Sequence, residues 1–259
     1  MEANRLPAGA ALVTGGAKRI GRAIALALAG DGWDIAVHYG RSAAEAADTV
    51  RAVEALGRRA AAVGCDLADA AAVRALPVRC ARLLGPLVCV VNNASLFEYD
   101  SAGDFSPELL ARATAINVAA PVLLAQALAA QLPPGRQGVV INLLDQKLFN
   151  PNPDFLSYTL SKSALKEATV LLARALAPRV RVVGIAPGIT LLSGEQSAGG
   201  FALAHTKTPL GRSSTPEDIA QAVVFAVRAP AITGTTLLVD GGQHLVPSDR
   251  DVMFLTEKP

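Results

Sequence analysis

Residues 14–21 read TGGAKRIG, and they join an apolar run at residues 10–14 to an alanine-rich segment at residues 19–30. The short run is typical of a buried strand, and the longer segment has the spacing of a helix. Glycines let the backbone approach a pyrophosphate, whose charge is stabilised at a helix N-terminus. Because Arg19 stands where a regular G-x-G-x-x-G turn has its central glycine, the residues alone would also suit a tight turn without a ligand. Their place between a strand and a helix favours a dinucleotide site.

The alternation of short apolar runs and helical segments continues along the chain. Further strands are predicted at residues 34–38, 60–65, 87–92, 138–143, 180–185 and 236–239. Helix starts are predicted at Pro107 and Pro216, and Pro121 predicts a kink just after Asn117. The pattern indicates an α/β fold with one domain over residues 1–259, built as a Rossmann-type, doubly wound parallel sheet of about seven strands with helices on both faces. Residues 188–212 are the long irregular stretch, and we expect a substrate lid there rather than a disordered tip.

Composition narrows the classes of function. The chain has 259 residues, 51% of them hydrophobic, and a net charge of +2 without a block of like charge, so nothing favours nucleic acid or a membrane as partner. Residues 1–11 lack the pattern of a leader peptide, and no apolar run reaches the ~18 residues of a membrane helix. The three cysteines and three histidines show no metal-ligand spacing, so we expect free thiols and no metal. These features fit a cytoplasmic enzyme.

The end of the second strand indicates which nucleotide is bound. An NAD site usually has an acidic residue there, but this strand ends in His38, Tyr39, Gly40, Arg41 and Ser42. Arginine and serine can bind a 2′-phosphate, which favours NADPH over a merely solvated arginine. Asp66 and Leu67, after the third strand, could contact the adenine, although an aspartate that caps a helix is nearly as good an interpretation.

The segment after the fifth strand carries the acid–base chemistry. Tyr158 and Lys162 are four residues apart, so they share one face of a helix, and the lysine is expected to lower the pKa of the phenol. Asp145 precedes them where a ketone reductase would have a serine, and a carboxylic acid can protonate a ring nitrogen. Lys147 is expected to lower the pKa of Asp145. Asp145 could instead be a turn residue that bonds its own backbone.

With these motifs in family order, the chain resembles the short-chain dehydrogenase/reductase family. Its supporting motifs are residues 14–21, Asn92-Asn93-Ala94, Asn117, Tyr158 with Lys162, Pro187-Gly188 and Asp240-Gly241-Gly242. Residues 17–21, residues 38–45, the run Asn93-Ala94-Ser95-Leu96-Phe97 and Asp145 are similar to those of pteridine reductases and the related dihydromonapterin and dihydrofolate reductases.

That resemblance implies the roles of individual residues. Asp145, Tyr158 and Lys162 would handle the proton, and Asn117 would help a water relay. Arg19 and Ser95 would face the phosphates and the pterin, and Phe97 would stack on the pterin so that it lies against the nicotinamide. Substrate-binding residues would be Arg19, Ser95, Phe97, Asp145 and Tyr158. The residues expected to bind NADPH are Gly15, Lys18, Arg19, Ile20, His38, Tyr39, Arg41, Ser42, Asp66, Leu67, Asn93, Ala94, Ser95, Lys162, Pro187 and Gly188.

Three functional hypotheses follow from the sequence. The first is an NADPH-dependent reductase of a pterin or folate, such as dihydromonapterin, dihydrobiopterin or dihydrofolate, which by the resemblance would be a homotetramer. The second keeps the enzyme but takes a ketone such as a 3-oxoacyl thioester, and the absent serine argues against it. The third is a non-catalytic regulator that binds NADPH or a pterin, and the Tyr158/Lys162 pair argues against that. Phe97 as plain packing, and Leu191 and Leu192 as lid contacts, stay open.

Overall fold

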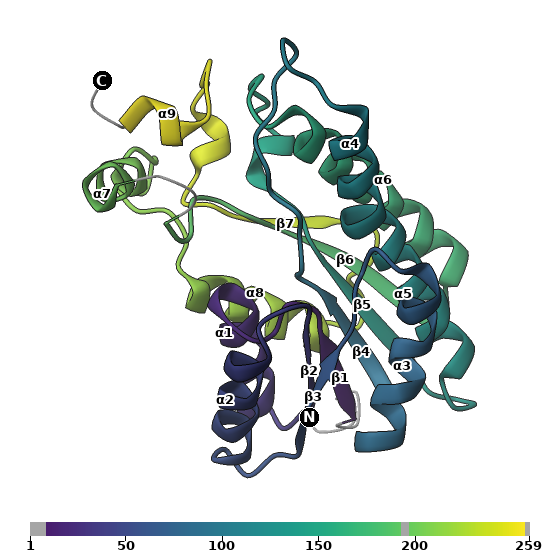
Figure 1. The fold of residues 1–259 in the computed structure, drawn as a ribbon. Coiled ribbons are helices and arrows are strands. Elements are labelled where there is room, and N and C mark those ends of the chain that lie inside the picture. The colour runs from purple at the N-terminus through teal and green to yellow at the C-terminus, as the bar shows by residue number, and fades with distance from the viewer. Residues whose placement is uncertain (1–8, 193–196, 257–259) are drawn as a thin grey trace.

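A computed structural model describes residues 9–192 and 197–256, and these residues form a seven-stranded parallel sheet (Figure 1). The strand order is β3-β2-β1-β4-β5-β6-β7, so the chain starts in the middle and winds outward in both directions. This confirms the predicted doubly wound sheet. The strands are β1 (Ala10–Val13), β2 (Asp34–Tyr39), β3 (Ala60–Gly64), β4 (Leu87–Asn92), β5 (Gly138–Leu143), β6 (Val180–Pro187) and β7 (Thr236–Val239).

Two layers of helices cover the sheet, as predicted (Figure 1). One face carries α1 (Arg19–Gly30), α2 (Ala43–Glu54) and α8 (Pro216–Arg228); the other carries α3 (Ala70–Leu84), α4 (Pro107–Thr114), α5 (Ala120–Gln131) and α6 (Leu156–Leu176). Because both faces are covered, every residue of β1, β4 and β5 is buried, which explains their continuous apolar sequences. The edge strand β7 is only half-buried. The three cysteines are buried and form no disulfide.

The predicted interruption near Pro121 is a π-helical segment, η1 (Ala115–Ala119), between α4 and α5. Proline has no N–H to continue the regular ladder, and π-helical turns of this kind often lie at functional sites. The buried Asn117 lies in this segment. The whole helical stretch Pro107–Gln131 is long and apolar enough to cross a membrane by length and composition alone, which the sequence analysis did not anticipate. Alanine accounts for much of this, and α5 packs against α3, α6 and β4.

The loops that follow the carboxyl ends of the strands build the site. The lid, predicted as irregular at residues 188–212, contains the helix α7 (Ala198–Thr206), and residues 193–196 lie outside the described part. Gly199 and Gly200 in its first turn have low helix propensity, so the sequence did not predict this helix. After β7 the chain continues through η3 (Gln243–Leu245) to α9 (Val252–Thr256), which packs on α7 (Figure 1). Residues 1–8 of the predicted leader-free start also fall outside the described residues.

Candidate active site

The proton-handling group comes from β5 and α6. Tyr158 and Lys162 lie one turn apart near the start of α6, and both are buried. Asp145 follows β5 and caps the short 3₁₀ helix η2 (Gln146–Leu148). The hydroxyl of Tyr158 donates to Oδ2 of Asp145 at 2.8 Å, while Oδ1 accepts from the backbone N–H of Lys147 at 2.8 Å. Asp145 is therefore both the turn residue of the alternative interpretation and the partner of Tyr158.

Burial decides the protonation of this group. It raises the pKa of the Asp145 carboxyl, against the lowering effect of its hydrogen bonds. It also raises the pKa of Tyr158 well above its usual value, and the neighbouring Asp145 adds to this. The expectation that Lys162 lowers the Tyr158 pKa is therefore wrong. Desolvation and the Asp145 carboxylate, 2.8 Å from the hydroxyl, have the larger effect on the Tyr158 pKa. The Lys162 ammonium donates instead to the Leu143 carbonyl at 2.7 Å. Burial lowers the pKa of Lys162 to about 8.

Lys147 does not act on Asp145 as expected. Its ammonium group turns away from that carboxyl and is buried, donating to the Asp154 carbonyl at 2.5 Å with Oδ2 of Asp251 at 3.5 Å. The backbone N–H of Lys147 lowers the pKa of Asp145, and the charges of the two side chains attract each other, but burial has the larger effect. The pKa of the Asp145 carboxyl therefore stays above its usual value, which is the direction that suits a proton donor.

Asn117 is a positioning residue. Its amide nitrogen donates to the Leu96 carbonyl at 3.0 Å and to the Ser161 hydroxyl at 2.9 Å. Its amide oxygen accepts from the Leu96 N–H at 2.8 Å and the Ser95 hydroxyl at 3.2 Å. All four hydrogen-bonding positions are used, so the expected relay is not made by this side chain. It ties the loop that carries Phe97 to α6.

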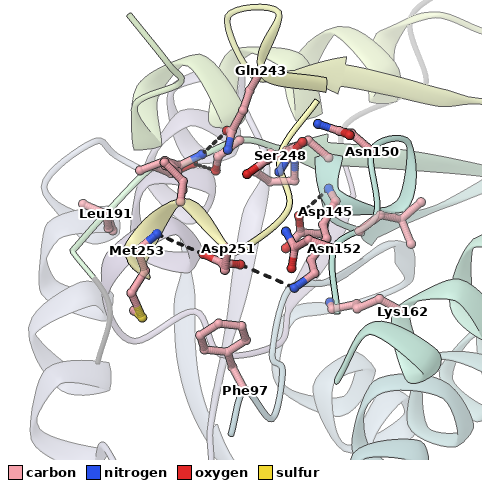
Figure 2. Close-up of a pocket in the computed structure, with 18 of the residues that line it drawn as sticks. Phe97, Asp145, Asn150, Asn152, Lys162, Leu191, Gln243, Ser248, Asp251 and Met253 are labelled. Atoms are coloured by element: carbon pink, nitrogen blue, oxygen red, sulfur yellow. Dashed lines mark hydrogen bonds and ion pairs between the residues drawn. The ribbon is translucent and has the colours of Figure 1, made fainter. Parts of the chain in front are cut away.

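A cavity of about 780 Å³ opens above the Asp145–Tyr158 pair, lined by the lid, the loop after β4 and the chain that follows β7 (Figure 2). Phe97 lines it and is 41% exposed. One side of its ring stacks on Phe155 at 4.2 Å between centroids, and Tyr158 meets it edge-on at 4.7 Å. The plain-packing alternative for Phe97 accounts for these contacts but not for its exposure to the cavity. Ser95, Leu191 and Leu192 also line the cavity.

The glycine-rich turn has the geometry of an anion site. The φ angle of Arg19 is 54°, in the left-handed region, which explains why a glycine commonly occupies this place. A Cβ on Gly21 would lie 2.1 Å from the Gly15 carbonyl oxygen, so only glycine permits the close crossing of turn and helix. No side chain caps the N-terminus of α1 and no acidic residue stands in its first turn, so its N–H groups are available for a negative charge.

Hydrogen bonds from neighbouring residues hold this turn in place. The Thr14 hydroxyl accepts from the backbone N–H groups of Asn93 and Ala94, and the Asn93 amide donates to the Thr14 carbonyl at 2.9 Å. His38 is buried; its Nδ1 accepts from the Gly15 N–H at 3.1 Å and its Nε2 donates to the Cys65 carbonyl at 3.0 Å. Both ring nitrogens are thus used within the protein, and a contact of His38 with the cofactor stays a prediction.

The end of β2 presents a cation without a carboxylate. Arg41 is exposed and makes no hydrogen bond or ion pair with the described residues, and Ser42 begins α2 without capping it through its side chain. Asp66 bonds the Ala68 N–H at 2.9 Å, while Asp69, not Asp66, caps α3. Of the other predicted cofactor residues, Ile20, Pro187 and Gly188 line the cavity. Lys18 precedes α1, Tyr39 ends β2 and the buried Leu67 follows β3, all outside the cavity lining. These groups fit an anionic dinucleotide.

The sequence analysis missed the chain after β7. The C-terminal segment, residues 243–256, lines the cavity with Gln243, Val246, Arg250, Asp251 and Met253. Gln243 accepts from the Ile189 N–H at 3.1 Å and so ties the segment to the lid. Its short helical pieces and mixed polarity give no periodic signal. The residue pattern alone therefore cannot predict that this segment lies over the carboxyl ends of the strands. Two closely spaced carboxylates, Asp249 and Asp251, were the available hint.

The doubly wound sheet, the glycine-rich turn and the Tyr158/Lys162 pair define a Rossmann-type oxidoreductase. The chain belongs to the short-chain dehydrogenase/reductase family: residues 15–244 match the family model described as Enoyl-(Acyl carrier protein) reductase.

Solved and curated relatives lie in several branches. The structure of FolM alternative dihydrofolate reductase 1 from Brucella canis, complexed with NADP, is 40% identical and covers 96% of this chain and 99% of its own, with a TM-score of 0.91. Pteridine reductase 1 of Leishmania tarentolae is 31% identical over 91% of this chain and 96% of its own. The 3-oxoacyl-acyl-carrier-protein reductase FabG of Staphylococcus aureus is 32% identical over 91% and 98%.

Proposed function

We propose that this enzyme reduces a C=N bond of a pterin, either a dihydropterin or dihydrofolate, with NADPH. The observation that carries the proposal is the hydrogen bond from Tyr158 to Asp145 on the cavity floor, with a carboxyl whose pKa burial has raised. A carboxyl of this kind can deliver a proton to a ring nitrogen near neutral pH, which a serine hydroxyl does poorly. The likeness to FolM and to pteridine reductase supports the same substrate class.

The choice of NADPH rests on the end of β2. Arg41 has no partner among the described residues, and no carboxylate follows the strand to bind the ribose hydroxyls of NAD. A guanidinium group recognises a 2′-phosphate by two parallel hydrogen bonds. The similar Brucella structure contains NADP, which supports this choice. When bound, the cofactor supplies the hydride.

The proton comes from the protein. In the reactive state Asp145 is protonated, and Tyr158 passes its own proton to the substrate nitrogen as it takes that of Asp145. The group ends as a carboxylate that accepts from the Tyr158 hydroxyl, which is the arrangement seen at 2.8 Å. Because the pKa of Tyr158 is raised, a phenolate beside an ionised Asp145 is unfavourable, and the relay avoids it. Lys162 contributes a positive charge that stabilises the resulting carboxylate.

Phe97 supplies a flat apolar wall. Its ring is stacked on Phe155 on one side and meets the edge of Tyr158, so its orientation is fixed before a ligand arrives. A heteroaromatic ring that stacks on it gains roughly 0.5–1.5 kcal/mol beyond the area buried. A fixed ring plane also holds the reacting atoms close to Tyr158, which lowers the entropic part of the barrier.

The test is NADPH oxidation in the presence of dihydropterins and dihydrofolate, with the unsubstituted enzyme and Asp145→Asn. The asparagine keeps the shape and can accept from Tyr158, but it holds no acidic proton, so we expect turnover to fall roughly 10²–10⁴-fold. The dissociation constant of NADPH, measured by fluorescence, should stay unchanged and serves as the control. Absence of turnover across a panel of pterins and folates by the unsubstituted enzyme would refute the proposal.

The second candidate is a ketone reductase, favoured by the likeness to the Staphylococcus aureus 3-oxoacyl reductase. Asp145 argues against it because it occupies the place where a ketone reductase has the serine that donates to the ketone oxygen. Asp145→Ser separates the two candidates. If Asp145→Ser gains ketone turnover that the unsubstituted enzyme lacks, the result supports the pterin reductase. If the unsubstituted enzyme itself reduces ketones efficiently, the result favours the second candidate.

A further inference from the structure

The C-terminal segment is fastened over the cavity by one buried carboxylate. Asp154, 3% exposed, accepts from Nε of Arg250 at 3.0 and 2.8 Å and from the backbone N–H of Asp251 at 2.7 Å. The Arg250 guanidinium also lies 4.8 Å from the centre of the Phe254 ring. These contacts join residues nearly one hundred positions apart in the sequence, and they fix the backbone immediately before and at Asp251. The position of the Asp251 side chain is therefore built into the fold.

This fastening brings Asp251 into the cavity. Figure 2 shows the Asp251 side chain beside Met253, in the same pocket as Asp145 and above Phe97. Oδ1 accepts from the Met253 N–H at 3.2 Å, and Oδ2 lies 3.5 Å from Nζ of Lys147. The charge of Asp251 raises the pKa of both Asp145 and Tyr158, which agrees with its facing them across the cavity.

Among the residues that the structure describes, the partners of the Asp251 carboxylate fill only part of its acceptor positions. A carboxylate offers about four acceptor positions, and Asp251 fills two of them, one with a long contact. Lys147 itself makes its shorter bond to the Asp154 carbonyl at 2.5 Å, so it is an incomplete counter-ion for Asp251. Two carboxylates, Asp145 and Asp251, thus share one cavity with an aromatic wall. A ligand with N–H donors on the edge opposite its reacting nitrogen could fill the remaining acceptor positions of Asp251.

We propose that Asp251 is a specificity-determining residue that accepts a hydrogen bond from the exocyclic amino group of a 2-aminopyrimidinone ring. The inference rests on the proposed function, and it names the group of the substrate to which the C-terminal segment would bind. Tyr158 and Asp145 serve the reacting nitrogen, Phe97 serves the ring face, and Asp251 serves the amino edge. A ketone offers only acceptors to this carboxylate, so the same residue disfavours ketones.

The experiment compares two substrates that differ in this one group: 6-methyl-7,8-dihydropterin, with a 2-amino group, and 6-methyl-7,8-dihydrolumazine, with a 2-oxo group. The kcat/KM of the unsubstituted enzyme should be at least roughly 10-fold to 100-fold higher for the pterin than for the lumazine. In the lumazine, the hydrogen bond from the amino group to Asp251 is replaced by repulsion between the oxo group and the carboxylate. Asp251→Asn should lose most of this preference through a higher KM for the pterin. Its KM for NADPH should change little.

Asp249→Asn is the matched control. It removes the same charge two residues away, from an exposed side chain that does not line the cavity, and it should keep the preference. Asp251→Glu retains the charge and should keep part of it. If Asp251→Asn weakens turnover of both substrates equally, or raises the KM for NADPH, Asp251 serves only the structure and the inference fails. If the unsubstituted enzyme reduces neither compound, the proposed function fails, which is a separate result.

Discussion

The buried ammonium group of Lys162 gives a prediction that can be measured without any substrate. The side chain is 3% exposed, and burial lowers its pKa from 10.5 to about 8. Each pH unit of this difference corresponds to about 1.4 kcal/mol, so holding the charge inside the fold destabilises the protein by roughly 3 kcal/mol near neutral pH. Lys162→Met removes the charge and keeps most of the apolar volume. It also removes the 2.7 Å bond to the Leu143 carbonyl, which offsets part of the gain at neutral pH.

The pH dependence separates these two effects. Between pH 8 and 10.5 the unfolded chain keeps a proton on Lys162 that the folded chain has released, so this residue makes the free energy of unfolding rise with pH in that window. Lys162→Met lacks this contribution. Urea unfolding of both proteins from about pH 7 to about pH 9.5 should therefore show their difference moving by roughly 2 kcal/mol in favour of the unsubstituted protein. Titrating groups that do not interact with Lys162, including Cys80 and Cys89, are common to both proteins and cancel.

Lys166→Met is the matched control, because it removes a charge from a more exposed position one turn further along α6. The activity of Lys162→Met should be lost at every pH, whatever its stability. A difference in unfolding free energy that stays constant from pH 7 to 9.5, or that moves in the opposite direction, would show that burial does not perturb Lys162 and would refute the reasoning.

Two further predictions concern the dinucleotide end. Arg41→Ala should raise the KM for NADPH roughly 10-fold to 100-fold while leaving that for NADH nearly unchanged, since it removes one charge-assisted contact; equal effects on both cofactors would contradict it. Gly21→Ala should destabilise the fold by roughly 1–3 kcal/mol because its Cβ meets the Gly15 carbonyl oxygen at 2.1 Å, whereas Gly30→Ala in the same helix meets nothing within 4 Å and should stabilise it by roughly 0.5–1 kcal/mol. Thermal unfolding ranks the two variants, and the reverse order would count against the close crossing.

Local patterns were enough to predict the sheet. The strands are short continuous apolar runs because helices cover both faces, and glycine or proline marks most of the boundaries, so position and type could be predicted together. The helix α7 was missed because Gly199 and Gly200 lower the helical signal of its first turn, while Ser197 caps it. Its formation depends on packing against α9, a contact that the sequence does not encode locally.

The candidate site was predicted in its parts but not in its energetics. Asp145 and Tyr158 could be paired from their places after β5 and on α6, and their 2.8 Å contact confirms the pairing. The direction of the Tyr158 pKa could not be predicted, because it depends on how deeply the group is buried. The direction in which Lys147 points was also out of reach, since its partner Asp154 is fixed by Arg250 from the other end of the chain.

The C-terminal segment has a consequence for how this enzyme can change over evolution. It follows β7, so no strand of the sheet depends on its sequence, yet it forms one wall of the cavity. The groups proposed to move the proton lie near the start of α6 and after β5. Substitutions of cavity-lining side chains after residue 243 that leave the Asp154–Arg250 pair intact can therefore change the shape and polarity of the cavity without altering the residues on α6 and after β5. The salt bridge between Asp154 and Arg250 joins this variable wall of the cavity to the loop that precedes α6, which carries Tyr158 and Lys162.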